Sequence, residues 1–342
     1  MFNLKKITMH GNQRLKITII IAIYNRKEEL QELLYSLIKQ TDKNFEIIVV
    51  DDGSEKKLET IVSSYANELD IKYFYKNNSG AGLSRNYGAR HASGNYYIFL
   101  DSDCIVPTNY IENVRNELKR NYVDAWGGAD SADKNFTDLQ KAISYSMTSL
   151  FTTGGIRGNK KSVNKFQPRS FNMGISKEAF DDVKGFSELR VGEDPDLSLA
   201  LWEKGYNTSF FPDCKVFHKR RSSLKKFSNQ IYHFGIARPI LNQRHPKFKK
   251  ITFWFPSIFM IFTVISVLLS FIEYWFILPL VFYCCLILID SSYRNRSLKI
   301  GLLSLVSTFI QFFSYGSGYL LSYVKVEILN IDPKIAFPSH YC

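Results

Sequence analysis

The chain has 342 residues, which is long enough for one sizeable catalytic domain and an appendage, and its formal net charge is +12. Its five cysteines show no metal-ligand spacing, which argues against a zinc site or a disulfide framework and for a reduced compartment. Between Phe253 and Ile289 the only charged residue is Glu273, which argues against a wholly soluble protein.

The first part of the chain alternates between strand-like and helix-like patterns. A basic extension over residues 1–16 lacks the small-residue cleavage site of a signal peptide, so we expect the following domain to stay inside the cell. The apolar, β-branched run Ile17–Ile23 predicts a strand buried on both faces of a parallel sheet, and Phe45–Val50 predicts a second buried strand. Further strands are predicted at Ile71–Tyr75 and Tyr96–Leu100. Helices are predicted from Leu30 to Ile38, near Lys57–Leu69 and near Gly82–Ala92. The order predicts an α/β sheet with right-handed crossovers.

Acidic residues follow the second and fourth of these strands. Ligands of such sheets collect at the carboxyl ends of the strands, so these positions are candidates for a site. Asp51-Asp52-Gly53-Ser54 fits an ordinary turn with Ser54 as a helix cap, or a nucleoside contact through Asp52 with Asp51 beside it. Asp101-Ser102-Asp103 can direct two carboxylates to one Mg²⁺ or Mn²⁺ ion, although turns and caps use the same residue types.

The segment Gly80–Gly88 has the glycine content of a dinucleotide-binding loop. It follows a polar loop and does not open directly off the first strand, so a dehydrogenase fingerprint fits poorly. Arg85 lies early in the helix predicted there, where its guanidinium and the helix N-terminus could hold a phosphate together. A lone arginine at such a position is more often a solvated surface group.

Six motifs in this order resemble glycosyltransferase family 2, whose catalytic domain has the GT-A fold. The resemblance covers Ile17 to about Phe217, and the matching segments are Ile20–Arg26, Asp51–Ser54, Gly82–Gly88, Asp101–Asp103, Phe171–Gly174 and Gly192–Leu197. Six motifs in the order of the family are far more specific than any one of them.

The resemblance implies a role for each matching position. The nucleotide-sugar donor, most commonly a UDP-sugar in this family, would meet Tyr24, Asn25, Asp51, Asp52, Arg85, Asp101 and Asp103. Asp103, with Asp101, would hold the metal, and His218 could be a further metal or phosphate contact or simply an exposed residue. Asp194 would be the general base that deprotonates the acceptor, and the acceptor side would include Asn172, Met173, Glu193 and Asp196. The Glu193-Asp194 pair could instead only stabilise a helix N-terminus.

Chemistry makes this assignment coherent. Departure of a nucleoside diphosphate builds negative charge that a cation neutralises, while the acceptor hydroxyl loses a proton as it attacks. In-line attack would invert the anomeric configuration.

A basic segment over residues 222–252 leads into the apolar part of the chain. Its lysines, arginines and aromatic residues predict an interfacial segment that binds anionic lipid or a lipid-linked phosphate, and a nucleic-acid partner is the weaker alternative. About three transmembrane helices are predicted over residues 253–324, at Phe253–Ile272, Tyr274–Ile289 and Ile300–Tyr323. The alternative, helices buried in a soluble protein, lacks the polar face that such helices normally keep.

Charge distribution predicts an orientation for these spans. Arg294, Arg296 and Lys299 lie between the second and third spans, and the basic domain precedes the first, so both should face the cytoplasm. The third span would then place the tail, residues 325–342, on the opposite side.

Together these patterns predict a GT-A catalytic domain over residues 17–221 at a cytoplasmic membrane, adding one sugar to a polyprenyl-diphosphate-type lipid-linked saccharide. A processive polysaccharide synthase is the first alternative. Processive relatives carry Gln-x-x-Arg-Trp where this chain has Gln230-Ile-Tyr-His-Phe234, and no span precedes the catalytic domain, which disfavours polymerisation. A non-catalytic sugar-nucleotide-binding scaffold is the second alternative, and it is disfavoured because every expected acidic position is present.

Overall fold

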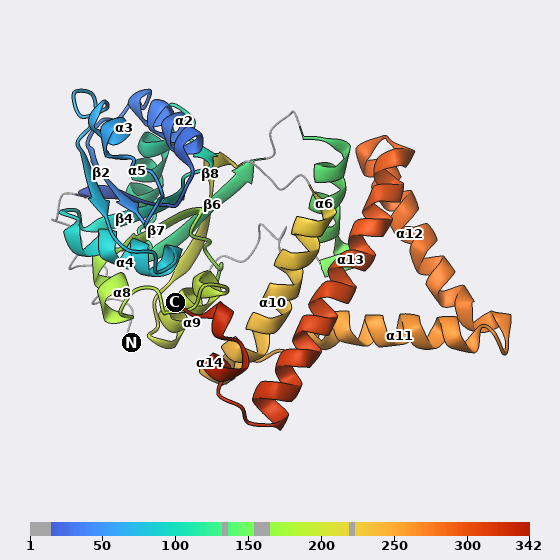
Figure 1. The fold of residues 1–342 in the computed structure, drawn as a ribbon. Coiled ribbons are helices and arrows are strands. Elements are labelled where there is room, and N and C mark those ends of the chain that lie inside the picture. The colour runs from blue at the N-terminus through green and yellow to red at the C-terminus, as the bar shows by residue number, and fades with distance from the viewer. Residues whose placement is uncertain (1–14, 132–135, 154–164, 219–222) are drawn as a thin grey trace. The chain divides into compact units, whose positions relative to one another are not determined.

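The structure is a computed structural model, and it describes residues 15–131, 136–153, 165–218 and 223–342 (Figure 1). The chain forms two compact units that interleave in the sequence. The first comprises Met1–Ser131, Val163–Ser187 and Ala200–Phe217, and the second comprises Ala132–Ser162, Glu188–Leu199 and His218–Cys342. Two stretches of sequence that lie between strands of the sheet belong to the second unit. The predicted end of the catalytic domain at residue 221 therefore stays a prediction.

An eight-stranded mixed sheet forms the centre of the first unit, in the order β3-β2-β1-β4-β7-β6-β8-β5. Its strands are β1 (Ile17–Ile23), β2 (Phe45–Asp51), β3 (Ile71–Tyr75), β4 (Tyr96–Asp101), β5 (Cys104–Ile105), β6 (Ala125–Ser131), β7 (Asn172–Ser176) and β8 (Thr208–His218). β1 pairs in parallel with both β2 and β4, and β7 is antiparallel to β4 and β6. The four predicted strands are confirmed.

Helices cover both faces of the parallel strands. They are α2 (Lys27–Ile38), α3 (Glu59–Ser63), α4 (Ala81–His91), α5 (Tyr110–Arg120) and α8 (Lys177–Asp182). One face of β1, including Ile19 and Ile21, packs in a core with residues of α2 and α5. On the other face α4 approaches closely through Gly88, where a Cβ atom would lie 2.6 Å from Ile20 Cγ2. Burial on both faces explains why β1 is apolar throughout.

The second unit is mostly helical. It contains α6 (Asp138–Thr148), α7 (Leu150–Thr153), α10 (Leu224–Arg244), α11 (Phe255–Leu269), α12 (Leu278–Asn295), α13 (Leu298–Ser322) and α14 (Pro333–Ala336). α9 (Glu193–Glu203) begins in this unit, and its last turn belongs to the first. Among the residues that the structure describes, three segments are long and apolar enough to cross a membrane, namely Ile251–Leu269, Tyr274–Asn295 and Leu298–Ile328.

α10, which contains most of the predicted interfacial segment, packs closely against α13. A Cβ atom on Gly235 would lie 2.3 Å from the Tyr315 carbonyl oxygen, and one on Gly318 would lie 2.3 Å from the Tyr232 carbonyl oxygen. Phe227 and Ile231 of α10 are buried. An apolar face of α10 is thus buried against protein, so its role is not confined to a lipid surface.

We expect Gly235→Val to destabilise this crossing. Two helix backbones meet where the new side chain would have to fit, and overpacking typically costs about 1–3 kcal/mol. Thermal unfolding in detergent measures the effect, with Asn229→Ala on the exposed face of the same helix as the control. Equal melting temperatures for the two variants would contradict this packing.

Candidate donor site and catalytic segment

The loops that follow β1 and β2 are joined by two hydrogen bonds. The Asn25 amide donates to Ser54 Oγ at 2.9 Å, and Asn25 Oδ1 accepts from the Glu55 amide at 2.9 Å. Asn25 adopts a left-handed backbone conformation, with φ at 53°, which asparagine tolerates better than most residues. Its neighbour Tyr24 is 49% exposed. Asn25 therefore shapes the loop, and the Tyr24 ring is accessible to a ligand.

Asp51 is buried at the end of β2 and holds the turn that follows. One carboxylate oxygen accepts from the Ser54 amide at 2.8 Å, and the other accepts from the Tyr73 hydroxyl at 2.7 Å. Burial and this bond raise the pKa of Tyr73, so the phenol remains a proton donor. Any part that Asp51 plays in donor binding would therefore be to position its neighbour Asp52.

Asp52 is held by the loop after β3. Its Oδ1 accepts from Lys76 Nζ at 2.6 Å and from the Ser79 amide at 2.9 Å, and its Oδ2 accepts from the Gly80 amide at 2.8 Å. Gly80 has φ at 87°, a conformation that favours glycine. Lys76 was not among the predicted site residues, although its position directly after β3, at the same edge of the sheet, could have pointed to it.

We expect Lys76→Met to weaken donor binding about tenfold, because a hydrogen bond to a charged group contributes roughly 1.5–3 kcal/mol. The substitution leaves the buried Asp52 carboxylate with backbone donors and without its lysine partner. Calorimetric titration of the donor measures the change, and Lys119→Met on the exposed end of α5 is the control. Unchanged affinity would exclude Lys76 from the site.

Two arginines meet the acidic pair at the end of β4. Arg85 Nη2 donates to Asp101 Oδ1 at 2.7 Å, and Arg26 Nη1 donates to Asp103 Oδ2 at 2.6 Å. Arg85 is buried, with its guanidinium carbon 5.4 Å from the centroid of the Phe186 ring. It is thus not the solvated surface group that a lone arginine usually is. Arg26 ends the segment Ile20–Arg26 that matches the family, but no role was predicted for it.

Asp101 and Asp103 can supply part of the ligand set of a divalent cation, but not all of it. No group of three or more His, Cys, Asp or Glu residues that could hold a metal occurs among the described residues. Mg²⁺ is commonly held by one or two carboxylates, with substrate phosphates and water completing its shell. The pair suits such a shared site, in which the donor supplies the remaining oxygens. The His218 side chain lies outside the described part of the chain, so its metal role stays a prediction.

Asn172 and Met173, predicted for the acceptor side, are buried in β7. The Asn172 side chain accepts from the Tyr110 hydroxyl at 2.7 Å and donates to the Cys214 carbonyl at 2.8 Å. Met173 is 1% exposed. Both side chains therefore fix the sheet, and any acceptor contact by this segment would come through other groups.

The segment Gly192–Leu197 begins α9 in the second unit. Gly192 has φ at 93°, and Asp194 lies in the first turn, where its carbonyl accepts from Ser198 Oγ at 2.9 Å. Glu193 and Asp194 are both partly exposed. The N-terminus of the helix favours an ionised carboxylate, which is the form that a general base requires.

Asp196 joins α9 to the end of α10. It is buried, and its oxygens accept from Arg244 Nε at 2.8 Å, Arg244 Nη2 at 3.1 Å and His245 Nε2 at 3.0 Å. These bonds occupy both oxygens of the carboxylate. Asp196, predicted on the acceptor side, thus orients the turn that carries Asp194.

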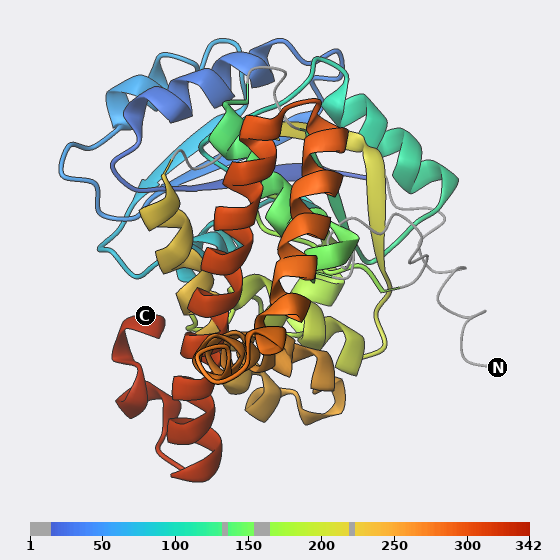
Figure 2. The ribbon, with the colours of Figure 1, turned by 90° about the vertical axis from the view of Figure 1, so that its right-hand side faces the viewer.

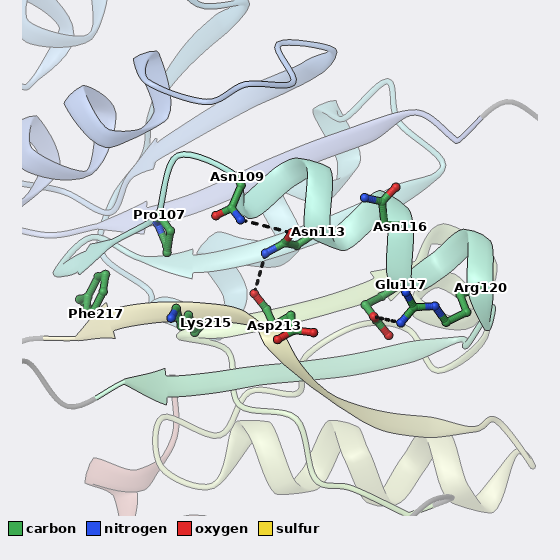
Figure 3. Close-up of a pocket in the computed structure, with 9 residues that line it drawn as sticks. All are labelled: Pro107, Asn109, Asn113, Asn116, Glu117, Arg120, Asp213, Lys215 and Phe217. Atoms are coloured by element: carbon green, nitrogen blue, oxygen red, sulfur yellow. Dashed lines mark hydrogen bonds and ion pairs between the residues drawn. The ribbon is translucent and has the colours of Figure 1, made fainter.

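A shallow pocket of about 510 Å³ lies between α5 and β8 (Figure 3). Its walls come from Asn109, Asn113, Glu117, Asp213 and Lys215, among others, and the Asn113 side chain donates to the Asp213 carbonyl at 2.9 Å. None of the predicted donor-site residues lines this pocket. The candidate donor site is therefore built from the strand-end residues and does not include this pocket.

The mixed sheet with helices on both faces has the GT-A fold, which is found in solved glycosyltransferases. A mannosyltransferase of Pyrobaculum calidifontis, solved with GDP-Man and Mn²⁺, aligns with 94% of this chain and 89% of its own at a TM-score of 0.56 and 16% identity. TarS residues 1–349 of S. aureus, solved with UDP-GlcNAc, align over 93% of each chain at a TM-score of 0.50 and 15% identity. These likenesses concern the fold.

The family follows from sequence comparison. The model of glycosyl transferase family 2 matches residues 18–184. An uncharacterized glycosyltransferase of Haemophilus influenzae is 31% identical over 218 residues, which are 61% of this chain and 70% of that protein. An uncharacterized glycosyltransferase of Rickettsia typhi is 40% identical over 126 residues, which span 36% of this chain and 39% of that protein. The chain belongs to glycosyltransferase family 2.

Proposed function

We propose that the protein is an inverting, metal-dependent glycosyltransferase that moves one sugar from a nucleoside-diphosphate donor, UDP-sugar first, to a hydroxyl of a lipid-linked saccharide. The observation that carries the proposal is the set of carboxylates at the carboxyl ends of β2 and β4, the two strands that flank β1, with Arg85 of α4 bonded to one of them. The carboxylates are Asp52, Asp101 and Asp103. A lipid-linked acceptor is inferred from the apolar helices, because an enzyme held at a bilayer meets substrates that are anchored in the same bilayer. The site would lie on the cytoplasmic side of the inner membrane.

Each residue would contribute one physical step. Asp52, fixed by Lys76 and two loop amides, would accept hydrogen bonds from the nucleoside, and the exposed Tyr24 ring would cover the base. Arg26 and Arg85, which now pair with the acidic residues, would be available to the diphosphate. A Mg²⁺ or Mn²⁺ ion bound by Asp101 and Asp103 would neutralise charge on the leaving group. Asp194 would take the proton from the attacking hydroxyl.

The structure offers no observation that favours a processive synthase. The Gln230–Phe234 tract lies within α10, where Phe234 packs beside Phe227 and Ile231, and His233 Nδ1 lies 3.3 Å from His340 Nε2. Its residues are thus engaged in packing of the second unit. Long products from a single encounter with a short primer would nevertheless overturn single addition.

A thermal-shift screen of the purified protein against nucleotide sugars, with and without Mn²⁺, tests the proposal. A ligand at 100 times its Kd stabilises the folded state by about 2.7 kcal/mol, which is a readily measured shift. We expect one donor to raise the melting temperature, and more so with the ion present. Transfer of its sugar to a lipid extract would then establish catalysis. A screen without any stabilising donor would contradict both the enzyme and the scaffold alternative.

A further inference from the structure

We infer that the catalytic sheet and the C-terminal tail lie on the same side of the membrane, so that α11 and α12 enter and leave the bilayer from that side and α13 does not cross it. This inference rests on the membrane association in the proposed function. The sequence alone predicted three membrane crossings and a tail on the far side of the membrane. The present inference replaces that prediction.

The tail pairs with the segment that precedes the proposed base, and all of these residues belong to the second unit. The Arg190 amide donates to the His340 carbonyl at 2.8 Å, and the Cys342 amide donates to the Glu188 carbonyl at 2.8 Å. Leu189 and Tyr341 form an antiparallel bridge between these bonds. A further ion pair joins Lys334 Nζ to Glu188 Oε1 at 2.7 Å.

Apolar packing supports this pairing. Leu189 is buried in one cluster with Ile240 of α10 and with two residues of the tail, Val326 and Phe337; Val326 lies in the helical turn Tyr323–Ile328 that follows α13. His340 is also buried, and desolvation together with the neighbouring His233 lowers its pKa, so its imidazole stays neutral at physiological pH. The tail is therefore a packed part of the unit.

Covalent connection fixes the side on which this pairing occurs. Glu188–Arg190 lies between β7 and β8 of the sheet, and the sequence from residue 177 to residue 207 contains no apolar run long enough to cross a bilayer. This stretch must lie on the side of the sheet. The tail, being paired with it, must lie there too.

The other end of α13 is attached to the same side. Lys299 Nζ lies 2.9 Å from Asp138 Oδ2 of α6, and the Tyr145 hydroxyl of α6 donates to Asp290 Oδ2 at 2.7 Å. α6 follows β6 in the sequence. Six residues, 132–137, join the two elements, and four of them are polar or charged. Both ends of α13 thus contact segments from the side of the sheet, which a membrane-crossing helix cannot do.

The composition of α13 agrees with this placement. Its mean hydropathy is 1.4, against 2.1 and 1.9 for the other two segments, and 39% of its apolar window is buried within the protein, against 22% and 17%. The buried face carries small and hydroxyl residues, including Ser304, Ser307, Thr308, Gly316 and Gly318. Such a face suits packing against other helices of the same protein.

α11 and α12 present the surface that a bilayer would cover. α11 and α12 lead away from α13 and meet at a turn (Figure 1), and α12 contacts α13 where Ser291 Oγ lies 2.7 Å from Ser304 Oγ (Figure 2). Near this turn Phe271 is 85% exposed and Ile272 is 76% exposed, and Trp275 is exposed beside them. Aromatic residues of this kind are enriched where helices meet the membrane interface. Because this surface carries few charges, lipid is the partner that we expect to cover it.

Labelling of the native Cys342 tests the inference in the full chain. The thiol is exposed, whereas Cys104 and Cys214 are buried, and Cys284→Ala with Cys285→Ala removes the remaining thiols. We expect a membrane-impermeant maleimide to label Cys342 in inverted membrane vesicles, with loss of labelling in spheroplasts. Asn67→Cys, exposed in the first unit, in a Cys342→Ser background should behave identically. Labelling of Cys342 in spheroplasts, or protection in both preparations, would overturn the inference.

A cross-link supplies the second measurement. The antiparallel bridge places residue 188 opposite residue 342, so Glu188→Cys should join to Cys342 with a short bis-maleimide in intact membranes. Glu188→Cys with Cys342→Ser is the matched control and should show loss of the link. Absence of the link in the first variant would contradict the pairing. Neither readout needs transfer activity, so a negative result in either one would not contradict the proposed function. A negative donor screen would likewise not contradict this topology.

Discussion

Asp194→Asn should lower kcat by about a hundred- to ten-thousandfold, the usual contribution of a positioned general base. Asparagine keeps the size and the hydrogen-bonding reach of aspartate but cannot take a proton at neutral pH. The substituted residue lies in the first turn of α9, and its carbonyl bond to Ser198 does not involve the carboxylate. The fold should therefore survive, and the Kd of the donor should change little. Steady-state transfer rates together with donor titration separate the two effects.

Glu193→Gln is the matched control for this substitution. It removes one negative charge from the same helix turn without touching Asp194, so any effect of the helix terminus appears in both variants. If Glu193→Gln lost as much turnover as Asp194→Asn, the pair would be a helix-terminal feature, as the sequence also allowed. Full turnover by Asp194→Asn would reject the assigned base outright.

Asp103→Asn should abolish the effect of metal on donor binding and reduce transfer by about a hundred- to a thousandfold, in line with the removal of one group that stabilises developing charge. An amide is a weaker ligand than a carboxylate for Mg²⁺ or Mn²⁺. The substitution also removes the partner that Arg26 contacts at 2.6 Å. Thermal shifts with donor and a Mn²⁺ series measure the first effect, and initial rates measure the second.

Chelation with EDTA provides the parallel test on the unmodified protein. The wild type should lose transfer and regain it with added Mn²⁺, whereas Asp103→Asn should respond weakly to either treatment. Glu68→Gln, an exposed acidic residue of the first unit, should behave as the wild type. Full activity of the wild type in EDTA would contradict a metal-dependent donor site.

Local patterns predicted the parallel part of the sheet well. β1 and β3 have the expected bounds, and β2 and β4 extend one residue further, to Asp51 and Asp101. In β1 and β2, runs rich in β-branched residues and buried on both faces leave little choice of structure or register. The helix expected near Lys57–Leu69 was too long, since α3 covers only Glu59–Ser63. There Leu58 closes the preceding turn, its amide donating to the Tyr73 hydroxyl.

The acidic positions were predictable because the fold brings successive strand ends to one edge. Their cationic partners were not. Lys76 and Arg26 pair with Asp52 and Asp103 across 24 and 77 residues, and a lysine or arginine in a loop has no sequence pattern that distinguishes a paired side chain from a solvated one. Likewise, the family motif pointed to Asn172, but it gave no indication that the amide of this residue is bonded inside the sheet.

The C-terminal region shows the same limit at longer range. Length and hydropathy found three apolar helices, and they gave no indication that residues 340–342 return to residues 188–190. Such pairing depends on backbone groups far apart in the sequence. The glycines at the crossing of α10 and α13 were the readable sign of close helix packing, although the basic charge nearby pointed to a lipid surface.

The most direct test of the account is calorimetric titration of one donor, chosen by the thermal-shift screen, into the wild type, Asp103→Asn and Asp194→Asn in the presence of Mn²⁺. The account predicts equal affinity for the wild type and Asp194→Asn, and affinity weaker by at least about tenfold, or roughly 1.4 kcal/mol, for Asp103→Asn. Undiminished binding by Asp103→Asn, or its loss in Asp194→Asn, would contradict the division of the site into a metal-and-donor cluster and a separate base.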